Sequence, residues 1–171
     1  MLKNDKISLR AVEPEDLEFL YKYENLPEIW ACNSRKEPFS RFALKEYVSN
    51  CDKTIYERGQ LRFMVTLNEN NRTIGAVDLF DFDYHNGRAE VGIFISQEFQ
   101  NQGFGLQALE LLTDYSFHFL NIEQLYAYIL KENCSAVKLF RHAKFEHCAT
   151  LKRWFFHKDQ YCDCAVFQRF R

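Results

Sequence analysis

Residues 88–130 restrict the possible folds more than any other part of this sequence. Two apolar segments, RAEVGIFIS at 88–96 and QLYAYIL at 124–130, have the length and composition of strands, and a mostly apolar helix separates them. A strand, a helix and a second strand in this order predict parallel pairing through a right-handed crossover. The sequence therefore predicts an α/β fold.

Further strands and helices are expected before and after this unit. Alternating polar and apolar residues indicate strands, and apolar residues spaced by three or four indicate helices. Two of the strands are close enough to form an antiparallel hairpin through the turn YHNG. The expected strands are 6–10, 61–67, 73–83, 88–96, 124–130, 150–156 and 161–168. The expected helices begin near Pro14, Ser40, Gly103 and Asn133.

Length, charge and hydropathy exclude several classes of protein. A chain of 171 residues predicts one domain, and a net charge of −2 provides no general attraction to nucleic acid or to an anionic membrane. No apolar run approaches the roughly 20 residues that span a bilayer, and the first residues lack the apolar core of a signal peptide. We therefore expect a cytoplasmic protein that binds neither nucleic acid nor membrane.

The six cysteines predict neither a metal site nor a disulfide framework. Only Cys162 and Cys164 are close together, and no second Cys or His pair stands at the spacing of a zinc site. Reduced and mostly buried thiols are the better interpretation, and no metal is expected.

The turn QNQGFG at residues 100–105 contains two glycines and leads directly into a helix. Helix N-termini present N–H groups without partners, and glycine lets an anion approach them closely. The spacing fits neither the dinucleotide-binding fingerprint nor the P-loop. Taken alone, these residues leave two interpretations open, a phosphate site or an ordinary tight turn.

The motifs above, in this order, resemble the GNAT superfamily of N-acetyltransferases. The resemblance covers nearly the whole chain, from SLRAVEPEDLEFL through the glycine turn and the segment LTDYSFHFLNIEQLYAYILKENCSAVKLFRHAKFE to the closing hairpin. Within the superfamily, the sequence is most similar to the spermidine and diamine N-acetyltransferases. The N-terminal acetyltransferases of ribosomal proteins are the next most similar group.

The resemblance implies one N-acetyltransferase domain over residues 1–171, with acetyl-CoA as cosubstrate. The implied fold is an α/β domain with a mixed, mostly antiparallel sheet of about six to seven strands, flanked by about four helices. This sheet would be splayed at its centre, and the cosubstrate would fill the gap like a missing strand.

The resemblance also implies where acetyl-CoA binds. Backbone N–H groups from Gln102 to Leu106 would hold the pyrophosphate, and Gln100 would support their loop. Asn133 would bond the pantetheine arm, cap its helix, or do both. The implied cosubstrate-binding residues are Val91, Ile93, Ile95, Gln100, Asn101, Gln102, Gly103, Phe104, Gly105, Leu106, Asn133 and Phe140.

The implied reaction moves an acetyl group from a thioester to an amine. An alkylamine is protonated at neutral pH, so a base must remove its proton before it can attack. Glu90 is the candidate base, and an exposed carboxylate paired with Arg88 or with solvent is the alternative. A backbone N–H near Phe94 or Ile95 would hold the developing oxyanion.

Two positions depart from the pattern of the apparent relatives. Phe140 stands where they usually carry a tyrosine that protonates the departing thiolate, and Lys144 stands where they usually carry glycine. Phenylalanine cannot donate a proton. Water, Tyr126, Tyr128 or a proton of the substrate would have to replace the tyrosine, or the step would proceed unassisted.

The acceptor is predicted from a group of acidic residues. Asp78, Asp81 and Glu90 would bind a polycation such as spermidine, although a solvated acidic turn is an equally good interpretation. Asp78 and Asp81 point to opposite faces of a regular strand, so both contribute only if a bulge intervenes. The segment SRKEPFSR at 34–41 is mixed and basic where the polyamine-regulated relatives are acidic, so such regulation is expected to be lost or altered.

Three function classes follow. The first and preferred one is an acetyltransferase that acts on a polyamine or another small amine. A homo-oligomer is a possible assembly in any of the three classes. The second is an N-terminal acetyltransferase of a protein, such as a ribosomal protein. The third is a catalytically weak acetyl-CoA-binding module, which the phenylalanine at position 140 favours.

Overall fold

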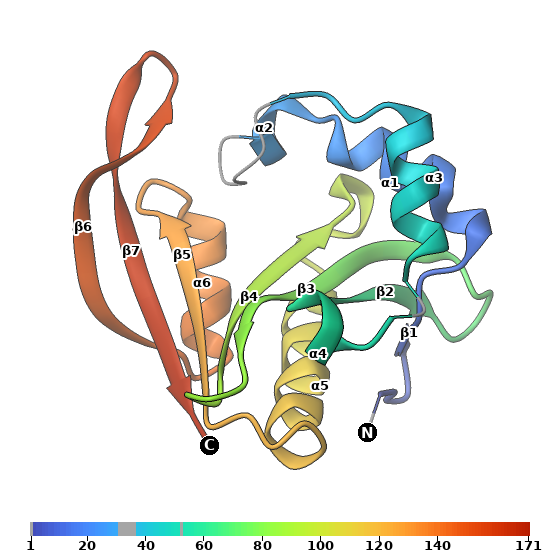
Figure 1. The fold of residues 1–171 in the computed structure, drawn as a ribbon. Helices are drawn as coiled ribbons and strands as arrows, with labels where there is room; N and C mark the ends of the chain where they lie inside the picture. Colours follow the sequence, from blue (N-terminus) through green and yellow to red (C-terminus); the bar gives the residue numbers. More distant parts are fainter. Residues whose placement is uncertain (1, 31–36, 52) are drawn as a thin grey trace.

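The computed structural model describes residues 2–30, 37–51 and 53–171, which form a seven-stranded sheet with helices packed on it (Figure 1). Strands β4 and β5 pair in parallel, and the other neighbours pair antiparallel. The predicted mixed, mostly antiparallel α/β sheet is confirmed. In spatial order the strands are β1 (Ile7–Arg10), β2 (Leu61–Leu67), β3 (Thr73–Asp83), β4 (Arg88–Ile95), β5 (Gln124–Leu130), β7 (Gln160–Phe170) and β6 (Glu146–His157).

The helices differ greatly in length. In the described residues they are α1 (Leu17–Glu24), α2 (Pro27–Trp30), α3 (Arg41–Ser49), α4 (Ile55–Arg58), α5 (Phe104–His118) and α6 (Cys134–His142), with short 3-10 turns at Pro14–Asp16 and Gln97–Phe99. The single-turn helices α2 and α4 were not predicted. Helix α4 follows a capping box in which Thr54 and Glu57 satisfy each other's backbone N–H groups. The T-x-x-E spacing in the sequence is a signal for this helix start.

Two helices begin at the residues that the sequence predicts as caps. The Ser40 hydroxyl accepts a hydrogen bond from the Ala43 N–H at 3.0 Å, and the Asn133 side-chain oxygen accepts one from the Ala136 N–H at 3.1 Å. Each bond satisfies an N–H group that has no partner within the first turn. Both cap predictions are confirmed.

The helices cover both faces of the sheet. Neighbouring residues of a strand point to opposite faces, so Met64 and Ala76 pack with α1 and α3, whereas Val65 and Val77 belong to the larger cluster that includes α5 and α6. Any opening through the sheet therefore leads from the α5 and α6 layer to the α1 and α3 layer.

Strands β4 and β5 separate part-way along their length. Their pairing covers only residues 88–90 of β4 and 124–126 of β5. Figure 1 shows the two strands diverging beyond this point. The predicted splay at the centre of the sheet is confirmed, and it leaves one edge of residues 91–95 without a neighbouring strand among the described residues.

Lys144 occupies the position where the resemblance predicts a glycine. Its φ is +61°, in the left-handed region that favours glycine. The residue follows α6, where the Phe145 N–H donates to the Phe140 carbonyl at 2.9 Å and closes the turn. The backbone geometry of this turn therefore explains why glycine suits the position.

The closing hairpin is longer than predicted and is irregular. Strands β6 and β7 span residues 146–157 and 160–170, where the sequence predicts 150–156 and 161–168. The pairing of β6 shifts register between Leu151 and Phe155, so a bulge interrupts the strand. Side chains in the bulge do not follow the alternation of a regular strand.

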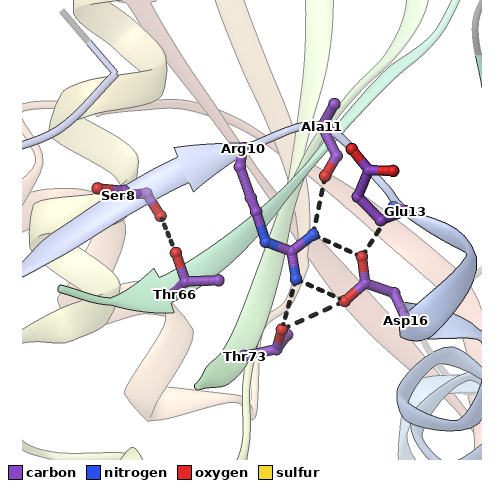
Figure 2. A network of polar contacts seen from close by, with 7 residues as sticks. All are labelled: Ser8, Arg10, Ala11, Glu13, Asp16, Thr66 and Thr73. Atoms are coloured by element: carbon purple, nitrogen blue, oxygen red, sulfur yellow. Dashed lines mark hydrogen bonds and ion pairs between the residues drawn. The ribbon is translucent and has the colours of Figure 1, made fainter. Parts of the chain in front are cut away.

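An ion pair between the buried Asp16 and the partly exposed Arg10 holds the start of α1 against the sheet. Asp16 is 3% exposed and accepts hydrogen bonds from Arg10 at 2.6 and 2.8 Å, from the Glu13 N–H at 2.9 Å and from the Thr73 hydroxyl at 3.2 Å (Figure 2). Burial alone raises the pKa of Asp16, but the bonds from Arg10 and Glu13 outweigh it and hold the pKa below its usual value. The ionised carboxylate therefore positions α1.

Replacing Asp16 by Asn should lower the free energy of unfolding by about 1–2 kcal/mol at neutral pH, because Arg10 loses its charged partner but is exposed enough for water to replace part of the interaction. The folded-state pKa of Asp16 is depressed, so its contribution exists above the unfolded pKa and disappears as the pH falls through the folded value. Urea unfolding at pH 7 and below about pH 4 measures this difference. Asp5→Asn, at an exposed position, is the control, and an equal loss in both variants would contradict the account.

Candidate active site

A cavity of about 720 Å³ connects the glycine turn with the underside of α1. At one end it is lined by Gln100, Asn101, Gly103, Gly105, Asn133 and Leu139, which belong to the turn and to the α5 and α6 layer. At the other end it is lined by Tyr23, Glu24, Arg62, Asp78, Phe80 and Phe94, which belong to the α1 layer. The cavity therefore passes through the opening between β4 and β5.

The edge of β4 that faces this opening can be assigned from its hydrogen bonds. The Ser96 N–H donates to the Ile74 carbonyl of β3 at 2.8 Å, and backbone groups of a strand alternate in direction. Phe94 therefore directs its backbone groups toward β3, whereas Val91, Ile93 and Ile95 direct theirs toward the opening. The Ile95 carbonyl, which accepts from the Gln100 side chain at 2.8 Å, agrees with this assignment.

Of the two backbone groups predicted to hold an oxyanion, only that of Ile95 faces the opening. Phe94 instead contributes its ring, which lines the cavity and lies 4.7 Å from the ring of Tyr23 on α1. Backbone groups alternate in direction along every strand, but the pairing of β4 with β3 decides whether its odd-numbered or even-numbered residues face the gap. The sequence therefore left both residues as candidates.

The glycine turn presents the N-terminus of α5 to the cavity. Gly103 is the residue before the helix and has a φ of +83°, which a residue with a side chain rarely adopts. A Cβ atom at Gly105 would lie 3.4 Å from Leu139 and 3.7 Å from Ile95, so the passage between α5, α6 and β4 is narrow here. The left-handed turn explains Gly103, whereas a Cβ at Gly105 would make ordinary van der Waals contacts and only a larger side chain would fill the passage.

The other residues predicted around the cosubstrate lie in different environments. Asn101 and Leu106 line the cavity beside the glycines. The Gln102 side chain instead donates to the Glu98 carbonyl at 2.8 Å, and the Phe104 ring contacts Phe99. Val91 is buried in the core. For these last three residues, only backbone groups remain as possible contacts with a ligand in the opening.

Asn133, the cap of α6, and Phe140, within α6, were both predicted at the site but differ in their placement. Asn133 lines the cavity while it caps the helix. Phe140 is 3% exposed and packs against Phe145 and Phe167, with ring centroids 5.0 and 6.5 Å apart. The side chains that α6 directs at the cavity include Leu139 rather than Phe140.

Glu90 lies at the point where β4 and β5 part, partly buried. Burial, and then the charge of Asp81, raises the pKa of Glu90 to about 7. The alternative partner, Arg88, forms an ion pair with Asp83 at 3.1 Å instead. Tyr126 is opposite Glu90 on β5, and burial together with the Glu90 charge raises its pKa to about 12. A carboxyl group with a pKa near neutrality therefore lies where the pairing of β4 with β5 ends, beside the cavity rather than among the residues that line it.

Asp81 is brought close to Glu90 by a bulge. The pairing of β3 with β4 shifts register between Phe80 and Asp83, and Asp81 has a φ of +44°. The sequence predicts that Asp78 and Asp81 can both contribute only if a bulge interrupts the strand, and the structure contains a bulge at Asp81.

Replacing Asp81 by Asn should lower the pKa of Glu90, because it removes a negative charge that favours the protonated form. The decrease should be partial, since burial is the larger cause and stays in place. Carbon-detected NMR titration of the Glu90 carboxyl group measures it directly. Asp159→Asn, in the exposed turn of the closing hairpin, should leave the titration unchanged, and an unchanged pKa in the Asp81 variant would contradict the proximity.

Asp78 is already engaged by a buried arginine that the sequence did not single out. Its carboxylate accepts from Arg62 at 2.6 and 3.2 Å, and another nitrogen of Arg62 lies 2.6 Å from Glu24 of α1. Burial raises the pKa of Asp78, and the charge of Arg62 opposes this. One cation thus faces two carboxylates at the α1 end of the cavity. The sequence signals this cluster of charges only through Arg62, a charged residue between the apolar Leu61 and Phe63 of a predicted strand.

The dimensions and polarity of this site fit an extended, phosphorylated thioester. The N–H groups of the first turn of α5 suit a phosphate, and the unpaired edge of β4 suits amide groups. The family model described as "Acetyltransferase (GNAT) domain" matches residues 6–146. The chain belongs to this family. It is therefore an N-acetyltransferase that uses acetyl-CoA.

Known proteins from Vibrio cholerae are similar to this chain along nearly its full length. Its spermidine N(1)-acetyltransferase is 32% identical over 160 residues, which are 94% of this chain and 90% of that protein. A crystal structure of that organism's spermidine N-acetyltransferase with CoA and spermine has a TM-score of 0.87 at 30% identity and covers 98% of this chain and 96% of that chain. A dodecameric structure in an intermediate state has a TM-score of 0.82 at 30% identity, covering 98% and 95%. In the described part of the present chain, no helix is long and apolar enough to cross a membrane.

Proposed function

We propose that this chain transfers the acetyl group of acetyl-CoA to a primary amine of a polyamine such as spermidine. The observation that carries the proposal is the Glu90 carboxyl group, with a pKa of about 7, at the opening between β4 and β5. The similarity to spermidine acetyltransferases supports the choice of acceptor.

The cosubstrate would be held by backbone groups rather than by charged side chains. The N–H groups at the start of α5 would bind its phosphates, and the backbone groups of Val91 and Ile93 that face the opening would bind its amides. Asn133 would contact the arm where it enters the opening. When bound, acetyl-CoA supplies an acetyl group activated as a thioester. Ile95 would direct its N–H at the oxygen that gains charge.

Glu90 would accept the proton of the attacking ammonium group. With a pKa of about 7, a large fraction of Glu90 is ionised at neutral pH, and its basicity exceeds that of an ordinary carboxylate. Burial that raises the pKa also removes water that would compete for the amine. Bringing the cationic substrate close to Glu90 and Asp81 would favour both ionised carboxylates.

Tyr126 is the group that we propose as the proton donor in place of Phe140. The Phe140 ring packs in the core and carries no proton to donate, whereas Tyr126 is opposite Glu90 on the neighbouring strand. The absence of a phenol at position 140 also favours a second candidate function, namely that of a weakly catalytic acetyl-CoA-binding module.

We further propose that the chain acts in the cytoplasm and assembles as a homo-oligomer, as the dodecameric relative does. The expectation of altered polyamine regulation depends on the segment 34–41, and residues 34–36 lie outside the described residues. It remains a prediction from the charge of that segment.

The function is tested by measuring CoA release with a panel of acceptors. Spermidine, a monoamine and an N-terminal peptide are compared at saturating acetyl-CoA, with acetyl-CoA binding measured in parallel by calorimetry. We expect the highest kcat/KM with spermidine. A preference for the peptide would identify an N-terminal acetyltransferase, and binding without CoA release for any acceptor would identify a binding module.

A further inference from the structure

Three aromatic side chains form a continuous strip that begins beside Glu90. The ring centroids of Tyr126 and Tyr128 on β5 lie 5.6 Å apart, and those of Tyr128 and Trp154 on β6 lie 6.2 Å apart. The interplanar angle is 27° for the second pair, so the indole and the phenol are stacked. The strip leads away from the opening, across β7 and toward the edge of the sheet.

The register of the sheet places the strip on the same face as Glu90. Glu90 and Tyr126 are paired in parallel strands, and side chains of paired residues point to the same face. Tyr128 follows two residues later on that face. The alternate residues of β5, Ala127 and Ile129, point to the opposite face and are buried in the core.

Trp154 reaches this face because β6 is bulged. The pairing of β6 with β7 shifts register between Leu151 and Phe155, and Arg153 within the bulge has a φ of +53°. The Asp163 carboxylate holds the bulge by accepting from the Arg153 N–H at 3.1 Å and from Lys152 at 2.9 Å. A non-glycine residue held in the left-handed region is strained, and such strain is frequent at ligand sites.

Two of the three rings are open to solvent. Trp154 is 57% exposed and Tyr128 is 37% exposed. Stacking on each other covers only part of their surface, so the bulge directs a large aromatic side chain outward without burying it. An exposed aromatic strip of this kind, next to acidic residues, is a surface suited to a ligand.

The charges around the strip favour a cation. Glu90 and Asp81 lie at its inner end. The nearby cations have other partners. Arg88, whose charge reaches Tyr126 and Tyr128, pairs with Asp83 at 3.1 Å, Lys152 binds Asp163, and the guanidinium of Arg153 lies over Tyr161 at 5.3 Å. Within the described part of the chain, no Lys or Arg is placed over the rings of Tyr126, Tyr128 or Trp154.

We propose that Tyr126, Tyr128 and Trp154 bind the second, non-reacting ammonium group of a polyamine while its reacting amine lies at Glu90. An ammonium is attracted to a ring face within about 6 Å of the centroid, so neighbouring rings at 5.6 and 6.2 Å offer a continuous path for it. The methylene groups between the amines contact the same rings. The inference rests on the proposed function and assigns the preference for a polyamine over a monoamine to these residues.

The test compares spermidine with propylamine, which lacks the second ammonium. Trp154→Leu should reduce kcat/KM for spermidine by roughly three- to thirty-fold, mainly through KM, and leave that for propylamine unchanged. Trp154→Phe retains an aromatic face and should recover most of the loss. Phe156→Leu removes another exposed aromatic of β6, which packs on Tyr161 outside the strip, and should behave as the wild type. An equal decrease for both amines, or no decrease for spermidine, would overturn the proposal.

A binding measurement separates this proposal from the proposed function. Calorimetry with spermidine and the CoA-loaded protein should show weaker binding for Trp154→Leu even if the wild type acetylates no amine, in which case only the proposed function fails. If Trp154→Leu lowers the melting temperature, Tyr128→Leu provides the second variant. Unchanged spermidine affinity in the folded variants would contradict the aromatic site regardless of turnover.

Discussion

Glu90→Gln should lower turnover by a factor of roughly 10²–10⁴ and remove the rising limb of the pH–rate profile near pH 7, because glutamine cannot accept the proton of the amine. The amide keeps the size of the side chain, so we expect the acetyl-CoA affinity to be unchanged. Stopped assays of CoA release between pH 5.5 and 9 measure the profile, and calorimetry measures the affinity. The carboxylate form increases as the pH rises through about 7, and the rate increases with it.

Glu146→Gln is the matched control, since Glu146 is exposed at the start of β6. It should retain the wild-type rate and profile. A Glu90→Gln variant that retains both would mean that the amine arrives deprotonated or that another group acts as the base. Glu90 would then be only a partly buried carboxyl group at the edge of the opening.

Gly105→Val should weaken acetyl-CoA binding by roughly ten- to a hundred-fold. A Cβ at this position already lies 3.4 Å from Leu139, so the additional methyl groups of valine would occupy the passage or displace α6. Losing one or two charge-assisted hydrogen bonds to phosphate corresponds to this range. Calorimetry with CoA and thermal unfolding of each variant measure the two effects separately.

Gly105→Ala serves as the graded control, with a smaller loss of affinity because it adds only the Cβ. Gly103 is less informative, since its φ of +83° makes any substitution strained whatever lies nearby. A change there would mix backbone strain with loss of a contact. Unchanged CoA affinity in a folded Gly105→Val protein would show that the glycine serves only the turn.

Local patterns were sufficient to predict most of the fold. The Ser40 and Asn133 caps depend on residues within three positions, and the structure confirms both. The splay between β4 and β5 followed from the family resemblance and is confirmed by their short pairing. The bulge in β6 was not predictable, because it depends on Asp163, ten residues from Arg153 along the chain.

The sequence predicted the parts of the candidate site that depend on local backbone structure better than the parts that depend on which charged side chains form pairs. Glu90 lies within β4, and Gly103 and Gly105 lie at the start of α5, so the elements that position them are local in the sequence. Asp78 was expected to contact substrate, but the structure places Arg62 against it, from a strand 16 residues earlier. A single sequence contains no signal for which cation will reach a given carboxylate.

The position of Phe140 illustrates a third limit. Helical spacing placed Ala136 and Phe140 on one face, and Ala136 does line the cavity. Phe140 is one turn farther along α6, where Phe145 and Phe167 enclose it. Leu139 and His142, on either side of Phe140 in the chain, line the cavity, so the periodicity did not show which side of this helical face turns to the cavity and which to the core.

Identification of the product by mass spectrometry tests the central claim most directly. The protein is incubated with acetyl-CoA and spermidine, with Glu90→Gln and enzyme-free reactions in parallel. The account predicts spermidine carrying one acetyl group in stoichiometric amount with released CoA, formed by the wild type and strongly reduced in the variant. Released CoA with unmodified spermidine, or equal product from the wild type and Glu90→Gln, would contradict it.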